Sequence, residues 1–459
     1  MKGSKDHLIE KTFEAFFELE DMREIIRRSL PTGMSAVEED AFMKSTANLK
    51  SVIEALEKGT SEKQANFPQI VDRIGLRYRE EGNINIQPIQ AAGRLTPEAR
   101  KALISYGDGY STCDSCRKPF RLDKISRPPI ADFHEELAGF VNMDTARVVP
   151  GARRGFQAVT SSLVEKDDPV IVSSLAHYTE FLAVEAAGGK IREIPLDDDN
   201  KVDVGSTAEK IEDVIREDGK PPSLMMMDHF DYQYANEHDI KSIAGVAHDY
   251  DIPVLYNGAY TVGVMPVDGK KLGADFVVGS GHKSMASPAP SGVLATTDEY
   301  ADLIFRTTQM KGDVTGRKFG IKEVEMMGCT LMGGTLLAMM ASFPHVKKRT
   351  QNWDEEVRNS NRFMEEFLKI EGNKVISEYP RRHTLTKVDT TQTFDKVAKE
   401  HKRRGFFLSD ELSKLGIVGM FPGATRAWKL NTYGLSREKI DYLSDAFKEI
   451  AVKYNLNVD

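Results

Sequence analysis

The chain has 459 residues, of which 40% are hydrophobic, 29% charged and 8% aromatic, and its formal net charge is −8. This apolar fraction is ordinary for a globular protein and excludes disorder as the main state, while no apolar run reaches the roughly 18–20 residues that a membrane-spanning helix needs. The three cysteines cannot form a disulfide scaffold, so we expect a cytoplasmic protein, and the acidic balance excludes a basic coat for nucleic acid but not a local basic patch.

Residues 1–82 are expected to form a helical N-terminal extension. Between residues 9 and 30 apolar side chains recur three or four positions apart, which places them on one face of a helix that Pro31 ends. Ser35 and Glu38 have the spacing of a capping box, which predicts that a second helix begins there. Short helices of this kind bury little apolar surface on their own. We therefore expect the extension to dock on the rest of the chain or to bind a partner.

From residue 83 onward, short β-rich runs alternate with amphipathic helical stretches. This rhythm predicts an α/β domain over residues 83–344, with a mostly parallel seven-stranded sheet covered by helices on both faces. A smaller C-terminal α+β domain is expected over residues 345–459, ending in a helix from Ser436 to Tyr454. The seven β-rich runs are Arg147–Val149, Pro169–Ser173, Lys190–Pro195, Ser223–Met227, Pro253–Tyr256, Phe276–Gly279 and Gly292–Ala295.

The strongest site signal is a lysine, Lys283, in the sequence Gly-Ser-Gly-His-Lys-Ser at positions 279–284, directly after an apolar run. A lysine just past a strand, flanked by small residues and by Ser280 and His282, is where pyridoxal-phosphate enzymes hold the cofactor as a Schiff base. Hydroxyl and imidazole donors suit the cofactor's phosphate, and small residues let the backbone approach it. Taken alone, such a lysine is more often a structural or surface residue.

Three other loops strengthen that interpretation, because each also follows a predicted strand. Ala152 and Arg153 open a helix, where free amides and a fixed positive charge could hold a phosphate, although many turns into helices look alike. The ring of His177 could stack on a pyridine ring, although a lone loop histidine is usually only hydrogen-bonded. Asn257 stands where most enzymes of this type have an aspartate beside the ring nitrogen, a charge that asparagine cannot supply. Four such loops in the right order are harder to explain by chance than any one.

The three cysteines form a second constellation. Cys113 and Cys116 make a C-x-x-C motif, and Cys329 lies far downstream. The functional interpretations are redox chemistry, sulfur carriage as a persulfide, or three thiolate ligands of an iron–sulfur cluster. Zinc fits less well, because no histidine with ligand spacing accompanies the cysteines. Incidental thiols are the ordinary alternative.

Basic clusters occur in the last third of the chain. Runs of this kind are usually solvated faces, but on an acidic protein they could contact a phosphate backbone. Arg426 could face the active site or pair with a surface carboxylate. The clusters are Lys347–Arg349, Arg381–His383 and Lys402–Arg404.

From residue 83 to the C-terminus, these motifs together resemble the O-phosphoseryl-tRNA:cysteinyl-tRNA synthase family, pyridoxal-phosphate enzymes of the aminotransferase-like fold (fold type I) found in archaea. The lysine motif alone is shared with cysteine desulfurases, whereas the C-x-x-C motif with Cys329 is far more specific. Further stretches that carry the resemblance are 107–116, 151–153, 177–178, 257–260, 328–330 and 432–434.

The resemblance implies a role for each candidate residue. Lys283 would carry pyridoxal 5'-phosphate, His177 would stack on its ring, and Asn257 would sit beside the ring nitrogen. Gln233 stands where the family usually has an asparagine near the phenolic oxygen, which is a departure. The residues that would hold the cofactor phosphate are Ala152, Arg153, Ser280 and His282. The candidates for the phosphoseryl phosphate are Arg153, His177 and Tyr178, and sulfur would be handled by Cys113, Cys116 and Cys329, as persulfides or around an iron–sulfur cluster.

The implied reaction is the conversion of O-phosphoseryl-tRNA(Cys) to cysteinyl-tRNA(Cys), by β-elimination of phosphate and addition of sulfur from a sulfur donor. The resemblance also implies a homodimer, and residues 1–82 could link the enzyme to phosphoseryl-tRNA ligase. Three alternatives stay open. The chain could be a cysteine desulfurase, although an aspartate would then be expected at position 257. It could be a selenium-transferring relative, or a scaffold protein that assembles an aminoacylation complex through residues 1–82.

Overall fold

The computed structural model describes residues 2–29, 34–58, 83–89, 91–106, 111–112, 130–318, 320, 323–326 and 331–459. The chain divides into two compact units. The smaller consists of Met1–Asn85 and Leu412–Val418, and the larger of Ile86–Glu411 and Gly419–Asp459. None of the helices that the structure describes has the length and apolar character needed to cross a membrane.

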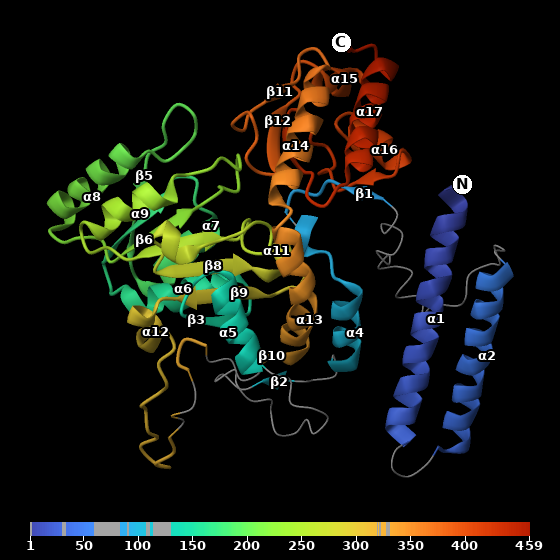
Figure 1. Cartoon of the computed structure of the whole chain (residues 1–459), viewed down its shortest axis with the longest axis horizontal. Helices are drawn as coiled ribbons and strands as arrows, with labels where there is room; N and C mark the ends of the chain where they lie inside the picture. Colours follow the sequence, from blue (N-terminus) through green and yellow to red (C-terminus); the bar gives the residue numbers. More distant parts are fainter. Residues whose placement is uncertain are drawn as a thin grey trace. The chain divides into compact units, whose positions relative to one another are not determined.

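Two long helices form most of the smaller unit, and they lie side by side (Figure 1). Helix α1 spans Lys2–Ser29 and helix α2 spans Ala36–Lys58, so the helical prediction is confirmed for this part of the extension. The predicted capping box is present, because the Ser35 backbone N–H donates to Glu38 Oε2 at 2.8 Å. In the same unit, strand β1 (Ile84–Asn85) pairs in parallel with β13 (Ile417–Val418).

The larger unit is built on a seven-stranded sheet with the strand order β3-β9-β8-β7-β6-β4-β5. Strand β9 is antiparallel to both of its neighbours, and the other strands are parallel to one another, so the predicted mostly parallel sheet is confirmed. All seven predicted runs form its strands. Their bounds are β3 (Thr145–Val149), β4 (Pro169–Ser173), β5 (Lys190–Ile194), β6 (Leu224–Asp228), β7 (Val254–Gly258), β8 (Phe276–Ser280) and β9 (Gly292–Thr296).

Alternate residues of the strands enter two cores, one on each face of the sheet. On β6, Met225 and Met227 pack with helices α5, α8, α9 and α13, whereas Leu224 and Met226 pack with α6, α7 and α12. Burial on both faces is why these strands appear in the sequence as continuous apolar runs. The helix bounds are α5 (Ile130–Phe140), α6 (Ala152–Leu163), α7 (Tyr178–Ala187), α8 (Val204–Asp218), α9 (Ile240–His248), α12 (Asp298–Ile304) and α13 (Gly333–Thr350).

The C-terminal part of the larger unit contains a three-stranded antiparallel sheet with the order β11-β12-β14. Trp428 of this sheet stacks on Phe447 of helix α17, with ring centroids 5.9 Å apart. Helix α17 spans Arg437–Lys453, which confirms the predicted C-terminal helix. The domain boundary at residue 344 stays a prediction, and α13 runs across that position. The other elements here are β11 (Lys374–Val375), β12 (Leu385–Asp389), β14 (Ala427–Asn431), α14 (Trp353–Leu368), α15 (Phe394–Glu400) and α16 (Phe406–Lys414).

The structure also describes several short elements in the larger unit. The Ala91–Gly93 turn approaches the backbone of His282 so closely that a Cβ on Gly93 would lie 2.0 Å from its carbonyl oxygen. The short elements are the 3-10 helix η2 (Ala91–Gly93), α4 (Pro97–Tyr106), α10 (Gly269–Leu272), α11 (Gly281–Ser284), β2 (Ser111–Thr112) and β10 (Leu331–Met332).

Candidate active site

The predicted site residues that the structure describes gather at the carboxyl edge of the large sheet. Strands β4, β6, β7 and β8 are neighbours and parallel, so their carboxyl ends share one edge. His177 follows β4, Asn257 lies near the end of β7, and Lys283 follows β8 directly in the four-residue helix α11. Ligands bind α/β sheets at this edge. The sheet thus brings together loops that are far apart in the sequence.

Lys283 has the properties of a reactive amine. Its Nζ lies 4.6 Å from the centroid of the Tyr260 ring, and a small cavity of ≈10 Å³ lined by Lys283, Tyr260 and Tyr433 lies beside it. Burial, against the opposing charge of Asp228 and with a smaller contribution from the charge of Lys429, lowers the pKa of the Lys283 ammonium group to about 8. With this pKa about a tenth of the amine is neutral at pH 7, far more than for an ordinary lysine, and the neutral amine is the form that attacks a carbonyl.

A half-buried arginine holds the loop that carries Lys283. The Arg349 guanidinium donates to the carbonyl oxygens of Gly263 at 3.1 Å, Ala92 at 2.9 Å and Ser284 at 2.5 Å. It also lies 5.4 Å from the ring centroid of Tyr433. Arg349 belongs to a predicted basic cluster, but its donors are directed to the protein interior. It therefore acts as a structural clamp rather than as a contact for nucleic acid.

Asn257 has a fixed amide orientation, because its Nδ2 donates to two buried carboxyl groups. Asp228 Oδ1 lies at 2.6 Å and Glu180 Oε1 at 2.7 Å, while Asn257 Oδ1 accepts from the Ala259 backbone N–H at 3.1 Å. The other oxygen of each carboxyl group has no hydrogen-bond partner in the described part of the chain. Burial raises the pKa of both Glu180 and Asp228 above the ordinary carboxyl range, and their proximity raises it further for Asp228. Two adjacent buried carboxyl groups do not both ionise readily, so the pair retains a proton near neutral pH.

His177 is an uncharged ring at physiological pH. Burial lowers its imidazole pKa to about 4, and the charges of Lys283 and Lys429 act in the same direction. Its Nδ1 accepts from the Thr179 backbone N–H at 3.4 Å at the start of α7, which assigns the ring proton to Nε2. The ring meets that of Tyr232 edge-to-face, with centroids 5.0 Å apart. A neutral, oriented imidazole is suited to stacking against a planar ligand.

The start of helix α6 forms a cradle for an anion. Gly151 precedes the helix with φ 91° and no side chain caps the first amides. Ser280 pairs in register with Gly292, and a Cβ on Gly292 would lie 2.7 Å from the Ala152 nitrogen. The hydroxyls of Ser280 and Ser291 are buried and lack a partner among the described residues. Free amides and free buried hydroxyls are the donors that a phosphate group requires, so the cradle fits the phosphate of pyridoxal 5'-phosphate.

The remaining candidates differ in what the structure shows. His282 is half-buried, with Nδ1 at 3.4 Å from the Ser291 carbonyl oxygen, and burial lowers its pKa. Arg153 and Tyr178 are exposed, and Tyr178 packs on His177 with ring centroids 4.3 Å apart. Gln233 is half-buried in a loop whose backbone amides bind the Asp231 carboxylate, with its own N–H at 2.8 Å. Direct contacts of Arg153, Tyr178 and Gln233 with a ligand stay predictions.

The cysteines Cys113, Cys116 and Cys329 lie outside the described residues. Thr112, which precedes Cys113, is described, and this residue of β2 pairs antiparallel with Leu331 of β10. Within the described part of the chain, no group of three or more His, Cys, Asp or Glu side chains could hold a metal ion.

The sequence interpretation missed the two carboxyl groups behind Asn257 and misjudged one basic cluster. Asp228 was visible as an acidic residue ending a strand of four apolar residues, but Glu180 looked like an ordinary first-turn helix acid. Arg381 and His383 are only 2% and 1% exposed, so the suggestion that they contact a phosphate backbone is wrong. Arg381 instead donates to backbone carbonyls such as that of Ala235, at 2.8 Å.

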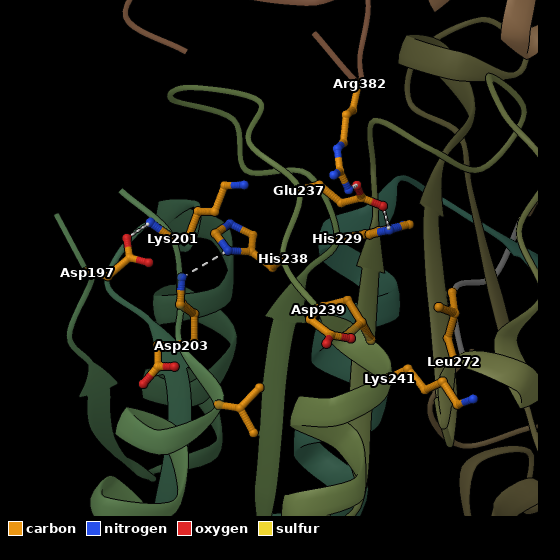
Figure 2. A pocket seen from close by; sticks show the side chains of 13 residues that line it. Asp197, Lys201, Asp203, His229, Glu237, His238, Asp239, Lys241, Leu272 and Arg382 are labelled. Atoms are coloured by element: carbon orange, nitrogen blue, oxygen red, sulfur yellow. Dashed lines mark hydrogen bonds and ion pairs between the residues drawn. The ribbon is translucent and has the colours of Figure 1, made fainter. Parts of the chain in front are cut away.

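A larger polar cleft of ≈460 Å³ lies elsewhere on the same unit (Figure 2). Arg382 of a predicted basic cluster lines it, but none of the predicted cofactor-binding or substrate-binding residues does. Three of its side chains, those of Arg382, Glu237 and His229, contact one another. Arg382 Nη1 donates to Glu237 Oε2 at 2.7 Å, and His229 Nε2 lies 3.5 Å from Glu237 Oε1. The other ring nitrogen of His229 lies 2.9 Å from the hydroxyl of buried Tyr256. These contacts account for the charges of Arg382 and Glu237 without a ligand.

Comparison with known proteins gives a consistent assignment. Residues 123–451 match the family described as O-phosphoseryl-tRNA(Sec) selenium transferase, SepSecS. An O-phospho-L-seryl-tRNA:Cys-tRNA synthase 2 from Methanoregula boonei is 68% identical over 98% of this chain and 99% of its own length. A protein of the same name from Methanospirillum hungatei JF-1 is 66% identical over 97% of this chain and 98% of its own length.

Solved structures resemble the chain at two levels. A crystal structure described as the SepCysS–SepCysE N-terminal domain complex has 40% sequence identity and a TM-score of 0.75, and the match covers 85% of this chain and 100% of that chain. The cysteine desulfurase CsdA of Escherichia coli has 14% identity and a TM-score of 0.62, covering 85% of this chain and 99% of that chain. The second similarity shows the fold alone, and it confirms the expected fold type.

Proposed function

Because this chain belongs to the O-phosphoseryl-tRNA:Cys-tRNA synthase family, we propose that it converts O-phosphoseryl-tRNA(Cys) to cysteinyl-tRNA(Cys) with pyridoxal 5'-phosphate as cofactor. The observation that carries this proposal is the identity of 66–68% to synthases over almost the whole chain, with Lys283, His177 and Asn257 gathered at one sheet edge. The family and the enzyme class expected from the sequence are thereby confirmed. The desulfurase alternative is not favoured, since its similarity is limited to the fold.

The residues of the site fit the cofactor. When bound, pyridoxal 5'-phosphate supplies a carbonyl that links to amines and an electron sink that acidifies the adjacent C–H bond. Ala152, Ser280 and His282 would bind its phosphate, together with Arg153 from the exposed side of α6. Asn257 would lie against the ring nitrogen. Its Nδ2 is occupied by two carboxyl groups, so it offers Oδ1 as an acceptor on that side.

Lys283 is positioned to move the proton of the reaction. Its lowered pKa lets the free amine take the proton from the substrate Cα, and the Cβ–O bond then breaks as the phosphate leaves with the bonding electrons. A sulfur nucleophile adds to Cβ, and Lys283 Nζ returns the proton to Cα. Arg153, His177 and Tyr178 are proposed to stabilise the departing phosphate. His177 would do so as a neutral N–H donor, because its pKa is about 4.

Cys113, Cys116 and Cys329 are proposed to deliver sulfur, either as persulfides or around an iron–sulfur cluster, from a separate sulfur donor. The antiparallel pairing of Thr112 with Leu331 supports a shared location for the two cysteine-bearing segments within one chain. Thr112 directly precedes Cys113, and Leu331 follows Cys329 by two positions. In the persulfide version the terminal sulfur of one cysteine persulfide would attack Cβ. The thiolate of a second cysteine would then attack the inner sulfur, which releases the product thiolate and leaves a disulfide between the two cysteines for an external thiol reductant to reduce.

The proposal includes a homodimer and a role for the N-terminal extension. Some relatives align over only 84% of this chain but over 98% of their own length, whereas others align over almost all of it, so a part of this chain is optional in the family. The crystal structure with 40% identity is a complex with a SepCysE N-terminal domain. These findings support α1 and α2 as an assembly segment, with phosphoseryl-tRNA ligase as the expected partner. The cytoplasmic location stays a prediction.

The decisive experiment is anaerobic incubation of the enzyme, loaded with pyridoxal 5'-phosphate, with O-phosphoseryl-tRNA(Cys) and sulfide. The amino acid is then released from the tRNA and identified by mass spectrometry. We expect cysteine on the tRNA and one inorganic phosphate per cysteine formed. In a parallel incubation with free cysteine in place of sulfide, alanine release with no cysteine on the tRNA would instead establish a desulfurase. A Lys283→Ala variant should give neither product.

A further inference from the structure

Two lysines lie directly opposite each other on neighbouring strands of the C-terminal sheet. Lys387 of β12 pairs in register with Lys429 of β14. Like charges at opposed positions of a sheet repel and destabilise it. Neither ammonium group forms an ion pair with any residue that the structure describes. The acidic side chain that influences Lys429, Asp231, already accepts from the backbone amides of its own loop.

Tyrosine rings place this pair beside the active site. Lys429 Nζ donates to the Tyr232 carbonyl oxygen at 2.7 Å and lies 5.2 Å from the centroid of the Tyr232 ring. The same ring meets His177 edge-to-face at 5.0 Å, so one aromatic ring separates Lys429 from His177. Lys387 Nζ lies 4.3 Å from the centroid of the Tyr234 ring. Both lysines are therefore held in place by neutral groups.

The positive charge of Lys429 acts on the side chains of Lys283 and His177. It lowers the pKa of both Lys283 and His177, which confirms electrostatic proximity. Both lysines are half-buried, and burial together with Lys387 lowers the pKa of Lys429 itself. Two neighbouring half-buried cations without a counter-ion cost free energy that an incoming anion would recover.

We propose that Lys387 and Lys429 form a phosphate-binding subsite beside His177, separate from the cradle at the start of α6. This inference rests on the proposed function, in which the substrate carries phosphate of two kinds. One is the phosphomonoester of the phosphoseryl group, and the other is the phosphodiester backbone near the 3' end of the tRNA. The pair would bind either through charge-assisted hydrogen bonds, with Lys429 oriented by Tyr232.

The test uses holoenzyme variants Lys387→Gln and Lys429→Gln and two probes. The first probe is O-phospho-L-serine, followed by the absorbance of the bound cofactor. The second is deacylated tRNA(Cys), followed by fluorescence anisotropy at several salt concentrations. We expect each substitution to weaken the binding of one of the two probes by about tenfold, because one charged hydrogen bond is lost. If the monoester is the ligand, only phosphoserine binding weakens. If the backbone is the ligand, only tRNA binding weakens, and its salt dependence becomes shallower.

The controls separate the possible failures. Lys374→Gln removes a lysine from β11 of the same sheet and should leave both probes unchanged, while Lys429→Arg should retain most of the binding. Unchanged affinity for both probes in both glutamine variants would overturn the subsite. A wild-type enzyme that binds neither probe would instead contradict the proposed function. If a variant does not fold, the test is the extent of chemical acetylation of each lysine in the wild-type protein. A bound probe should protect Lys387 and Lys429, but not Lys374, from acetylation. Equal labelling with and without the probe would reject the proposal.

Discussion

Asn257 donates its side-chain Nδ2 to Asp228 Oδ1 at 2.6 Å, and the two residues lie opposite each other on the neighbouring parallel strands β7 and β6. This contact fixes the orientation of the amide that we propose to lie beside the ring nitrogen of the cofactor. The carboxyl group of Asp228 would then reach that position only through the Asn257 amide. Glu180 supports the same nitrogen from helix α7 at 2.7 Å.

The two buried carboxyl groups behind Asn257, those of Glu180 and Asp228, should make the free energy of unfolding decrease as the pH rises. Burial raises the folded-state pKa of Glu180, so the folded protein binds the proton more tightly than the unfolded chain. Stability should therefore fall as pH rises from about 4, the ordinary carboxyl value, toward about 8. Glu180→Gln should reduce that fall by about 1.4 kcal/mol for each unit by which the pKa is raised. Urea unfolding at pH about 4.5 and about 8 measures it.

A matched control for this prediction is Glu185→Gln, because Glu185 is exposed on the same helix α7. That variant should keep the wild-type pH dependence. Equal slopes for wild type and Glu180→Gln would contradict the view that Glu180 is held protonated behind Asn257.

Reconstitution with the cofactor should report the pKa of Lys283 directly. The neutral amine attacks the pyridoxal carbonyl, so the rate of covalent attachment to the apoprotein should rise with pH, with a midpoint at about 8. Borohydride reduction followed by peptide mass spectrometry locates the attachment. Lys283→Ala should abolish the modified peptide, and Lys271→Ala, which removes an exposed lysine that precedes strand β8, should not. A midpoint near the ordinary lysine value of about 10.4 would show that the amine is not perturbed.

Much of this arrangement was predictable from the sequence, because strands buried on both faces appear as short apolar runs and their carboxyl ends bear small and polar residues. Lys283 and Asn257 were found in this way. Glu180 was not, since its role depends on how α7 meets β7, and this long-range contact leaves no local pattern. Arg381 was misjudged for a related reason. A sequence shows its charge but not the carbonyl oxygens, such as that of Leu385 at 2.7 Å, that receive its donors.

His177 should contribute to acid sensitivity. Burial depresses its folded-state pKa to about 4, whereas the unfolded chain takes up a proton near pH 6.5, so stability is lost as pH falls from about 6.5 toward about 4. At pH about 5 the loss is up to about 2 kcal/mol. His177→Asn should remove this part of the acid dependence, as measured by urea unfolding at pH about 7.5 and about 5. His401→Asn, in the C-terminal part of the chain, should retain it. An unchanged acid dependence in the His177 variant would show that the pKa of this ring is the same in the folded and the unfolded chain.

The Arg349 clamp predicts a coupling between stability and the order of the lysine loop. Arg349→Met would remove the guanidinium donors from the carbonyl oxygens of Gly263, Ala92 and Ser284, of which Ala92 keeps the Ala286 backbone N–H, at a cost of about 3 kcal/mol. Amide hydrogen exchange in residues 281–286 should accelerate with it, because Ser284 is one of the anchored positions. Lys348→Met removes an exposed neighbouring charge from the same helix and should change neither quantity. The stability and the exchange rate of Arg349→Lys should lie between those of the Arg349→Met and Lys348→Met variants. A single ammonium group lacks the fixed, forked set of donors with which a guanidinium reaches three carbonyl oxygens. A destabilised Met variant with unaltered exchange in this loop would restrict the arginine to a general packing role.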